Sequence, residues 1–298
     1  MISIRKLGKH LGAEIAGVDL SQPLDEHVFA AVSAAFFAHQ VAVFRGQSLA
    51  PAQQIAFTRR FGVLEHHVRR EHCLDGYPEI LVVSNVVKEG GRAIGVEDAG
   101  RFWHSDLSYK AEPSLLSALY ALEVPERDGT VMGNTSFAST LAAYEALSDK
   151  ARRRVASLRN VHSYRYYREK NRRAQREEQA RGGRAVDEHA PSEAQWLTVP
   201  DVELPLVRTH PVTGRKGLFV NEAHTSRIVG VPPEEGAALL AELCAHVVQP
   251  EFRYEHVWRA GDLLMWDNAA VQHKANFDYE LPLRRLMHRT TVRGSAPF

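Results

Sequence analysis

Residues 103–109 read WHSDLSY, and the interpretation of the whole chain depends on the histidine and the aspartate inside this stretch. In a β-strand, residues two apart project to the same face, so a strand here would place the imidazole of His104 beside the carboxylate of Asp106. Such a pair more often forms a structural hydrogen bond than a metal site, and the chain has 15 histidines. The interpretation as a metal site therefore needs a third ligand from elsewhere.

A third ligand is available far downstream. Residues 264–268 read LMWDN, an apolar strand that runs into a polar turn, and His273 follows closely. Two histidines and one carboxylate make the facial triad of non-haem Fe(II) oxygenases, which leaves coordination positions open for a 2-oxo acid and O2. We therefore predict that His104, Asp106 and His273 hold the metal and form the catalytic centre.

A basic segment follows the third ligand. Residues 284–289 read RRLMHR, and Arg285 and Arg289 would face the same side of a strand. The planar guanidinium of arginine matches a carboxylate through two parallel hydrogen bonds, which lysine cannot do. Arg285 is therefore a candidate anchor for the distal carboxylate of 2-oxoglutarate, although a surface pair of arginines is the alternative interpretation.

Three motifs, WHSDLSY, WDNAAVQH (266–273) and RRLMHRTT (284–291), resemble in order and separation those of the taurine dioxygenase (TauD/TfdA) family. The framing segments VFRGQ (43–47), FTRRFG (57–62) and NTSFAS (134–139) are similar as well, so the resemblance runs from Gly12 to Arg289. It implies a mainly β fold with flanking helices, a double-stranded β-helix (jelly roll) core, and one catalytic domain over residues 1–298. It also implies Fe(II), with 2-oxoglutarate and O2 as cosubstrates and succinate and CO2 as products.

The same resemblance assigns residues to the cosubstrate and the substrate. Thr135 and Arg285 fall where the family holds the tail of 2-oxoglutarate, and Arg289 matches an arginine that faces the cosubstrate or a substrate anion. His67 and the amide of Leu107 are implied to bind the substrate anion.

The sequence departs from the taurine enzymes around the substrate. Arg70 stands in place of a tyrosine, and His224 stands in place of an aromatic residue. Both are counted as substrate-binding candidates, and they point away from taurine itself. The predicted substrate is a small organic anion: a sulfonate, a sulfate ester, an aryloxyalkanoate or an N-substituted amino acid.

Two other classes of protein could carry two histidines and an aspartate. A zinc hydrolase on the same jelly-roll fold would use water at the fourth position of the metal, and it would not need Thr135 and Arg285. A non-catalytic binding protein would retain the three ligands and the arginine only by coincidence.

The segment from about 164 to 195 has an unusual composition, dense in arginine and glutamate and poor in aliphatic residues. It is predicted to be either a solvated helix with pairs of opposite charge or an inserted lid whose aromatic start, at Tyr164, Tyr166 and Tyr167, reaches the active site. Both descriptions can hold at once.

Composition limits the partners. The net charge is +1 and only two cysteines occur, without the spacing of a zinc site. With no signal-like segment and no run of about 18 apolar residues, we predict a cytoplasmic protein that binds neither nucleic acid nor membrane. The resemblance adds a homo-oligomer, a dimer or a tetramer.

Periodicity predicts the main elements outside the motifs. Helices are expected over 49–61 and 233–247, and a loop over 87–100. Strands are expected over 41–44, 80–84, 205–209, 217–221, 262–266 and 289–292.

Overall fold

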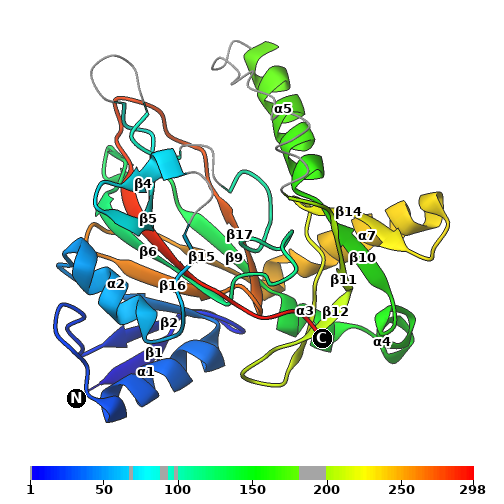
Figure 1. The fold of residues 1–298 in the computed structure, drawn as a ribbon, viewed down its shortest axis with the longest axis horizontal. Helices are drawn as coiled ribbons and strands as arrows, with labels where there is room; N and C mark the ends of the chain where they lie inside the picture. The colour runs from blue at the N-terminus through cyan, green and yellow to red at the C-terminus, as the bar shows by residue number, and fades with distance from the viewer. Residues whose placement is uncertain (1, 67–69, 88–92, 97–99, 181–198) are drawn as a thin grey trace.

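The computed structural model describes residues 2–66, 70–87, 93–96, 100–180 and 199–298. An eight-stranded sheet forms its centre (Figure 1), and only the β2–β3 pair in it is parallel. Its strands, in spatial order, are β1 (Ser3–Lys6), β2 (Ala13–Ala16), β3 (Val41–Phe44), β16 (Leu263–Asp267), β6 (Leu116–Glu123), β18 (Leu286–Val292), β5 (Tyr77–Ser84) and β4 (Cys73–Leu74).

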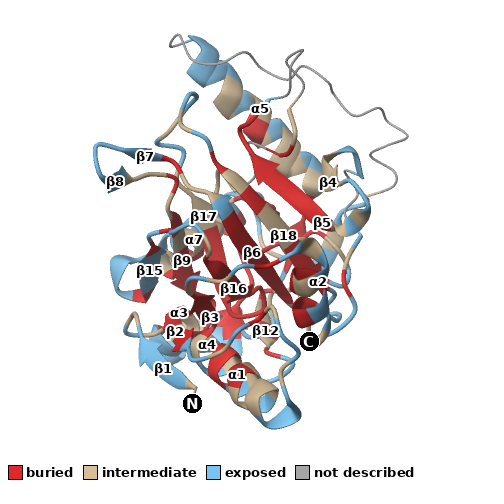
Figure 2. Ribbon diagram, turned by 90° about the vertical axis from the view of Figure 1, so that its left-hand side faces the viewer, coloured by how far each residue is buried: buried red, intermediate tan, exposed pale blue. Residues whose placement is uncertain are grey.

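Two helices cover one face of this sheet. They are α1 (Glu26–His39) and α2 (Pro51–Arg59); Phe57 of α2 packs on Phe44 of β3, and Phe36 of α1 belongs to the same hydrophobic cluster. The side chain of Asp25 accepts a hydrogen bond from the amide of Val28, 2.8 Å away, which satisfies a free donor at the start of α1. In Figure 2 the central strands are largely buried and the edge strand β1 is exposed.

A three-stranded sheet faces the other side. It consists of β15 (Arg253–His256), β9 (Thr135–Ser139) and β17 (Val271–Ala275), with β9 in the middle. Phe137 of β9 and Trp266 of β16 have ring centroids 5.9 Å apart, within a second hydrophobic cluster that includes Leu119 of β6. The candidate site lies on this inner face.

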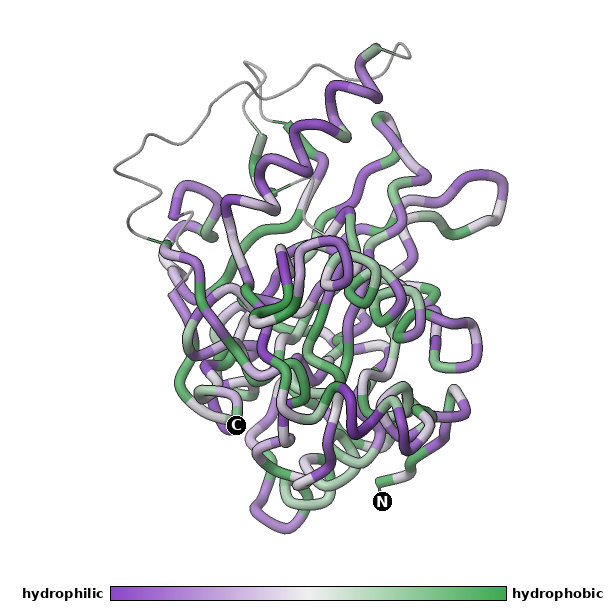
Figure 3. Tube along the Cα trace, turned by 90° about the vertical axis from the view of Figure 1, so that its right-hand side faces the viewer, coloured by the Kyte–Doolittle hydropathy of each residue, from purple (hydrophilic) through white to green (hydrophobic). Residues whose placement is uncertain are grey.

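A third cluster fills the remaining part of the molecule, to the right in Figure 1. The sheet β11–β10–β14 packs there against helices, and α5 leaves it as a hydrophilic projection (Figures 1 and 3). The elements are α3 (Thr140–Ala146), α4 (Asp149–Val155), β10 (Arg159–His162), α5 (Tyr164–Ala180), β11 (Val202–Pro205), β12 (Val207–Thr209), β13 (Lys216–Leu218), β14 (Thr225–Val229), α7 (Pro233–Val247) and η2 (Pro250–Phe252). The short elements β7 (Glu126–Arg127), β8 (Thr130–Val131) and η1 (Arg70–His72) lie outside the three sheets named above.

Most elements predicted from periodicity are present. Strand 41–44 and helix 233–247 match β3 and α7, and the strands over 80–84, 262–266 and 289–292 correspond to β5, β16 and β18. Helix 49–61 is shorter than predicted, since α2 begins at Pro51, whose ring favours the first helical position. Part of the predicted loop over 87–100 lies outside the described residues.

Two strand predictions are partly wrong. The strand over 217–221 ends at Leu218, because the side chain of Asn221 accepts from the amide of His224 and organises a turn there instead. The strand over 205–209 is two strands, since β11 pairs with β10 and β12 pairs with β13. Within the described part of the chain, no helix is long and apolar enough to cross a membrane.

Candidate metal centre

His104 and His273 meet through a single antiparallel β-bridge. The amide of His104 donates to the carbonyl of His273 (3.1 Å), and the amide of His273 donates to the carbonyl of His104 (2.8 Å). Residues directly opposite in such a pair project to the same face. The two imidazole rings therefore lie together, with centroids 4.1 Å apart.

Asp106 completes the group, although not in the way the sequence suggested. A strand through His104 and Asp106 was wrong, because His104 forms only the one bridge and Asp106 lies in a turn. The carboxylate is nevertheless beside the imidazoles, with Oδ1 3.7 Å from Nε2 of His104 and 4.0 Å from Nε2 of His273. One ligand atom from each residue lies within 4.8 Å of the others, the arrangement of a metal site.

The electrostatic environment sets the protonation states that a metal needs. Burial alone would raise the pKa of Asp106, but the guanidinium of Arg289 and the two neighbouring histidines hold it well below its usual range. Burial, with a smaller contribution from His104, lowers the pKa of His273 well below its usual value. An ionised carboxylate and a neutral imidazole are the forms that bind a cation.

The hydrogen bonds of the ligands also fit a metal. Nδ1 of His104 lies 2.9 Å from the carbonyl of Phe102, so this nitrogen donates and Nε2 keeps its lone pair for a cation. A donor set of two imidazole nitrogens and one carboxylate oxygen is the one that non-haem Fe(II) oxygenases use. The residues present therefore fit Fe(II).

Thr135 and Arg285 are the residues predicted to hold the cosubstrate. Both contact Trp258, which the sequence did not single out. Nε1 of Trp258 donates to Oγ1 of Thr135 (3.0 Å), and the guanidinium carbon of Arg285 lies 6.0 Å from the centroid of the Trp258 ring. Arg285 is 4% exposed, and its Nε has no hydrogen-bond partner in the described structure. A buried guanidinium with a free N–H fits a carboxylate.

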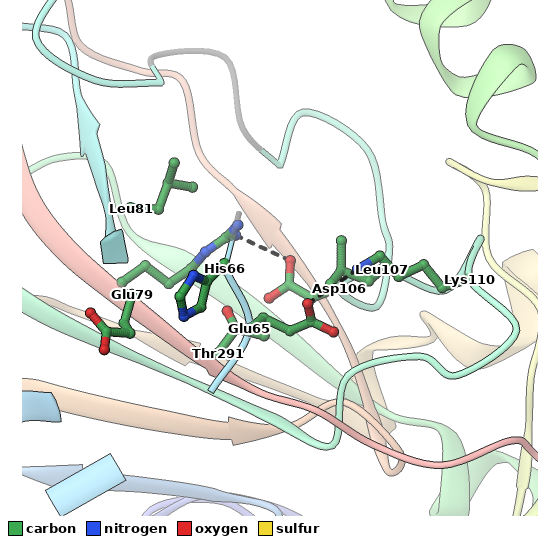
Figure 4. A pocket seen from close by; sticks show the side chains of 9 residues that line it. Glu65, His66, Glu79, Leu81, Asp106, Leu107, Lys110 and Thr291 are labelled. Carbon is green, nitrogen blue, oxygen red and sulfur yellow. Dashed lines mark hydrogen bonds and ion pairs between the residues drawn. The ribbon is translucent and has the colours of Figure 1, made fainter. Parts of the chain in front are cut away.

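A pocket opens beside Asp106 (Figure 4). Arg289 contributes to it from β18, and its Nη1 donates to Oδ1 of Asp106 at 3.1 Å. Nζ of Lys110 lies 3.2 Å from Oε2 of Glu65 at the same pocket. The residues that line it are Glu65, His66, Glu79, Leu81, Asp106, Leu107, Lys110, Arg289 and Thr291.

The predicted substrate residues are only partly brought together. Leu107 lines the pocket, and its positive φ of 55° is uncommon for a residue other than glycine. His67 lies outside the described residues, whereas the adjacent His66 lines the pocket. Arg70 is exposed at the start of η1 and is not among the described lining residues.

His224 lies on another side of the metal ligands. Its ring centroid is 6.1 Å from that of His104 and 5.0 Å from those of Tyr109 and Tyr167. Burial lowers the pKa of His224 well below its usual value, so its imidazole is neutral.

A relay of hydrogen bonds fixes the tautomer of this imidazole. Nδ2 of Asn221 donates to Oγ of Ser108, whose hydroxyl then donates to Nδ1 of His224, with both distances 3.1 Å. Nε2 of His224 therefore carries the proton as a neutral donor.

Two histidines and one carboxylate, with one ligand atom of each within 4.8 Å of the others, define a candidate mononuclear metal centre of the facial-triad class. Residues 3–291 match the family described as taurine catabolism dioxygenase TauD, TfdA family, and the chain belongs to this family.

Individual relatives are consistent with this family. The chain is 36% identical over 294 residues to an alpha-ketoglutarate-dependent 2,4-dichlorophenoxyacetate dioxygenase of Cupriavidus pinatubonensis, with 95% of each chain covered. It is 33% identical to pentalenolactone F synthase of Streptomyces arenae, with 96% of this chain and 92% of the relative covered. Among solved structures, AAD-2 in complex with Mn(II) and N-oxalylglycine has a TM-score of 0.77 and 31% identity, covering 100% of this chain and 99% of that one.

The family resemblance and the enzyme class predicted from the sequence are thereby confirmed. The fold is mainly β with several helices and is similar to that of other enzymes of this type. The predicted cofactors, Fe(II) and 2-oxoglutarate (alpha-ketoglutarate), agree with the relatives and with the donor set. Neither the zinc hydrolase nor the binding protein is supported.

Proposed function

We propose that the chain is an Fe(II)- and 2-oxoglutarate-dependent dioxygenase that hydroxylates a small anionic organic substrate. The observation that carries the proposal is the convergence of Nε2 of His104, Nε2 of His273 and Oδ1 of Asp106 on one point of the inner face. Bound iron supplies the oxidative chemistry, in which O2 and 2-oxoglutarate give succinate, CO2 and a hydroxylated product.

The protein's own residues bind and orient the reactants. Arg285 pairs with the distal carboxylate of 2-oxoglutarate through its free N–H, assisted by the hydroxyl of Thr135, whose oxygen already accepts from Trp258. The buried surroundings of Arg285 strengthen this pairing, since little water competes for the guanidinium.

The substrate anion is assigned to the pocket beside Asp106. Arg289, Lys110 and His66 supply donors there, and Leu107, whose amide was predicted to bind the anion, also lines the pocket. His67 and Arg70 stay predictions for the same role.

An aryloxyalkanoate is the substrate class that we favour among the four predicted. The rings of Tyr109, Tyr167 and His224 gather near His104, and they suit the edge or face of an aromatic group. A neutral His224 can also donate a hydrogen bond from Nε2 to the ether oxygen of such a substrate. The 36% identity to a 2,4-dichlorophenoxyacetate dioxygenase supports the same class.

We also assign the finer architecture here. The central sheet and the β15–β9–β17 sheet are the two halves of a double-stranded β-helix, within one catalytic domain over residues 1–298. The described start of the 164–195 segment acts as a lid, since the ring of Tyr164 packs at a tilt on that of Tyr109, with centroids 4.8 Å apart. Residues 181–198 lie outside the description. A cytoplasmic homo-oligomer, a dimer or a tetramer, remains the expectation.

A succinate assay tests the function and the substrate class together. Protein reconstituted anaerobically with Fe(II) is exposed to O2 and 2-oxoglutarate, alone or with an aryloxyalkanoate, a sulfonate, an alkyl sulfate or an N-substituted amino acid. We expect succinate above the uncoupled background with the aryloxyalkanoate. Succinate that rises with another class corrects the substrate, and no iron-dependent succinate with any class contradicts the oxygenase.

A further inference from the structure

Besides Arg289, two polar residues outside the metal triad hold Asp106: Ser117 contacts its carboxylate, and Asn268 contacts its main-chain amide. Oγ of Ser117, on β6, lies 2.6 Å from Oδ2 of Asp106, and Nδ2 of Asn268 lies 3.1 Å from the same Oγ. All three side chains are buried. Neither Ser117 nor Asn268 is explained by the roles assigned above.

The direction of these hydrogen bonds follows from their partners. Oδ1 of Asn268 lies 3.1 Å from the amide of Asp106 and 3.0 Å from Nε1 of Trp266. Both of those groups can only donate, so the oxygen of the Asn268 amide must face them and its nitrogen must face Ser117. Ser117 therefore accepts from Asn268, and its own hydroxyl hydrogen is directed at Oδ2 of Asp106.

We propose that Ser117 and Asn268 are positioning residues that make Asp106 a one-oxygen ligand of the metal. The short hydrogen bond from Ser117 occupies Oδ2, whereas Oδ1 faces the two imidazoles and also accepts from Nη1 of Arg289 at 3.1 Å. The backbone of Asp106 is held by the same Asn268 side chain, so both the position and the rotation of the carboxylate are fixed. This inference rests on the proposed function, since it concerns the metal of that site.

The number of oxygens that Asp106 contributes decides how many reactants the metal can accept. The facial triad of non-haem Fe(II) oxygenases leaves coordination positions open for the reactants. With one oxygen from Asp106, a bound metal would keep such positions for a bidentate 2-oxo acid and for O2, whereas a second oxygen from Asp106 would take one of them. Ser117 and Asn268 would thereby keep that position available.

Two substitutions break the path of hydrogen bonds from Asn268 through Ser117 to Asp106 at different points. Ser117→Ala removes the donor to Oδ2. Asn268→Asp keeps an acceptor for the amide of Asp106 and for Trp266, but it presents to Ser117 a second carboxylate oxygen that competes with Oδ2 of Asp106 for the single hydroxyl hydrogen. Ser114→Ala is the matched control, because Oγ of Ser114 is equally buried and donates to Asp106 at its main-chain carbonyl (3.1 Å) rather than at its carboxylate.

The test measures Co(II) binding to the full-length chain by calorimetry and by visible absorption, after circular dichroism has confirmed folding. We expect the dissociation constant to rise about 10- to 100-fold in Ser117→Ala and in Asn268→Asp, as is typical when a partner of a metal ligand is lost. We also expect the Co(II) spectrum to change in both, since the coordination of the ion changes, and to stay that of the wild type in Ser114→Ala.

Wild-type affinity for Co(II) and an unchanged Co(II) spectrum in both Ser117→Ala and Asn268→Asp would overturn the inference. An equal loss in Ser114→Ala would overturn it too, since the effect would then be general loosening around Asp106. If Ser117→Ala does not fold, Asn268→Asp decides alone. Failure of the wild-type protein to bind any divalent metal would instead contradict the proposed function.

Discussion

At the scale of single residues, the backbone beside the metal site is strained at one position. Leu107 keeps a left-handed backbone directly after Asp106, which costs about 1–2 kcal/mol for a residue with a side chain. Such strain persists where the surrounding contacts over-determine the backbone, and it is common at functional sites. Here the turn places Leu107 at the wall of the pocket.

Arg285 offers a residue-scale prediction with a control beside it in the sequence. Arg285→Lys should raise the KM for 2-oxoglutarate at least about 10-fold, because an ammonium cannot reproduce the paired hydrogen bonds of a guanidinium. Arg284→Lys is the control, since Arg284 pairs with Glu123 at 2.7 Å on the exposed surface. Steady-state kinetics at varied 2-oxoglutarate give both values. A KM that shifts equally in the two variants would show that Arg285 is not the anchor.

At the scale of elements, the charged helix α5 shows how composition and packing act together. Its ion pairs Arg165–Glu169 and Arg173–Glu177 are exposed, and each contributes only about 0.3–0.5 kcal/mol. The first turn of α5 attaches the helix to the rest of the protein through aromatic packing, because Tyr164 packs on Tyr109 and Tyr167 packs on His224. Over its described residues, Tyr164–Ala180, the charged segment is therefore the helix expected from the sequence, and its aromatic start packs on Tyr109 and His224.

Strand β10 carries a buried histidine that makes stability depend on pH. Burial, supported by the charge of Arg208, lowers the pKa of His162 from 6.5 to about 4, and the carbonyl of Phe219 opposes this shift only partly. Between these values the unfolded chain binds the proton and the folded chain does not. Stability is therefore full above pH 6.5 and is lost as the pH falls toward 4, by about 3 kcal/mol for this group.

The variant His162→Gln isolates this contribution. It is expected to be less stable than the wild type at pH 7, because a buried, well-packed ring is lost. Its free energy of unfolding should fall less steeply between pH 6.5 and 4, and urea unfolding at several pH values measures the difference. Parallel slopes in the two proteins would show that His162 does not carry the effect.

At the scale of the whole molecule, the metal centre joins parts of the chain that are distant in sequence. The turn at Asp106, strand β17 with His273 and strand β18 with Arg289 meet only when the two sheets pack face to face. Any ligand that binds this assembled site stabilises the folded chain over the unfolded one.

Metal and cosubstrate should therefore raise the melting temperature of the entire chain in one cooperative transition. At 100 times the dissociation constant, a bound ligand contributes about 2.7 kcal/mol, which corresponds to about 4 °C for a chain of 298 residues. Differential scanning calorimetry with Mn(II) and 2-oxoglutarate under argon measures the shift. The variant Asp106→Ala should fold and show no shift. Two separate transitions would argue against a single domain.

The sequence by itself singled out the candidate metal ligands and most of the elements. His104, Asp106 and His273 stand in recognisable motifs, and strands such as β3 and β16 are short apolar runs whose neighbours in sequence already favour extended backbone. Arg285 and Thr135 were predicted from the same motifs, and their role toward 2-oxoglutarate stays a prediction. The identity of a residue and the preference of a short segment for extended backbone are local properties, so they can be predicted from the sequence alone.

Only the tertiary structure decided how these residues are held. The bridge between His104 and His273, the turn that replaces the predicted strand at Asp106, and the contacts of Trp258, Ser117 and Asn268 all join segments far apart in the chain. A hydrogen bond depends on the distance and direction between its two groups, and for distant segments these are set only by the packing of the sheets. Serine and asparagine are also common in turns for local reasons, so nothing in their spacing distinguishes the two that orient the metal ligand.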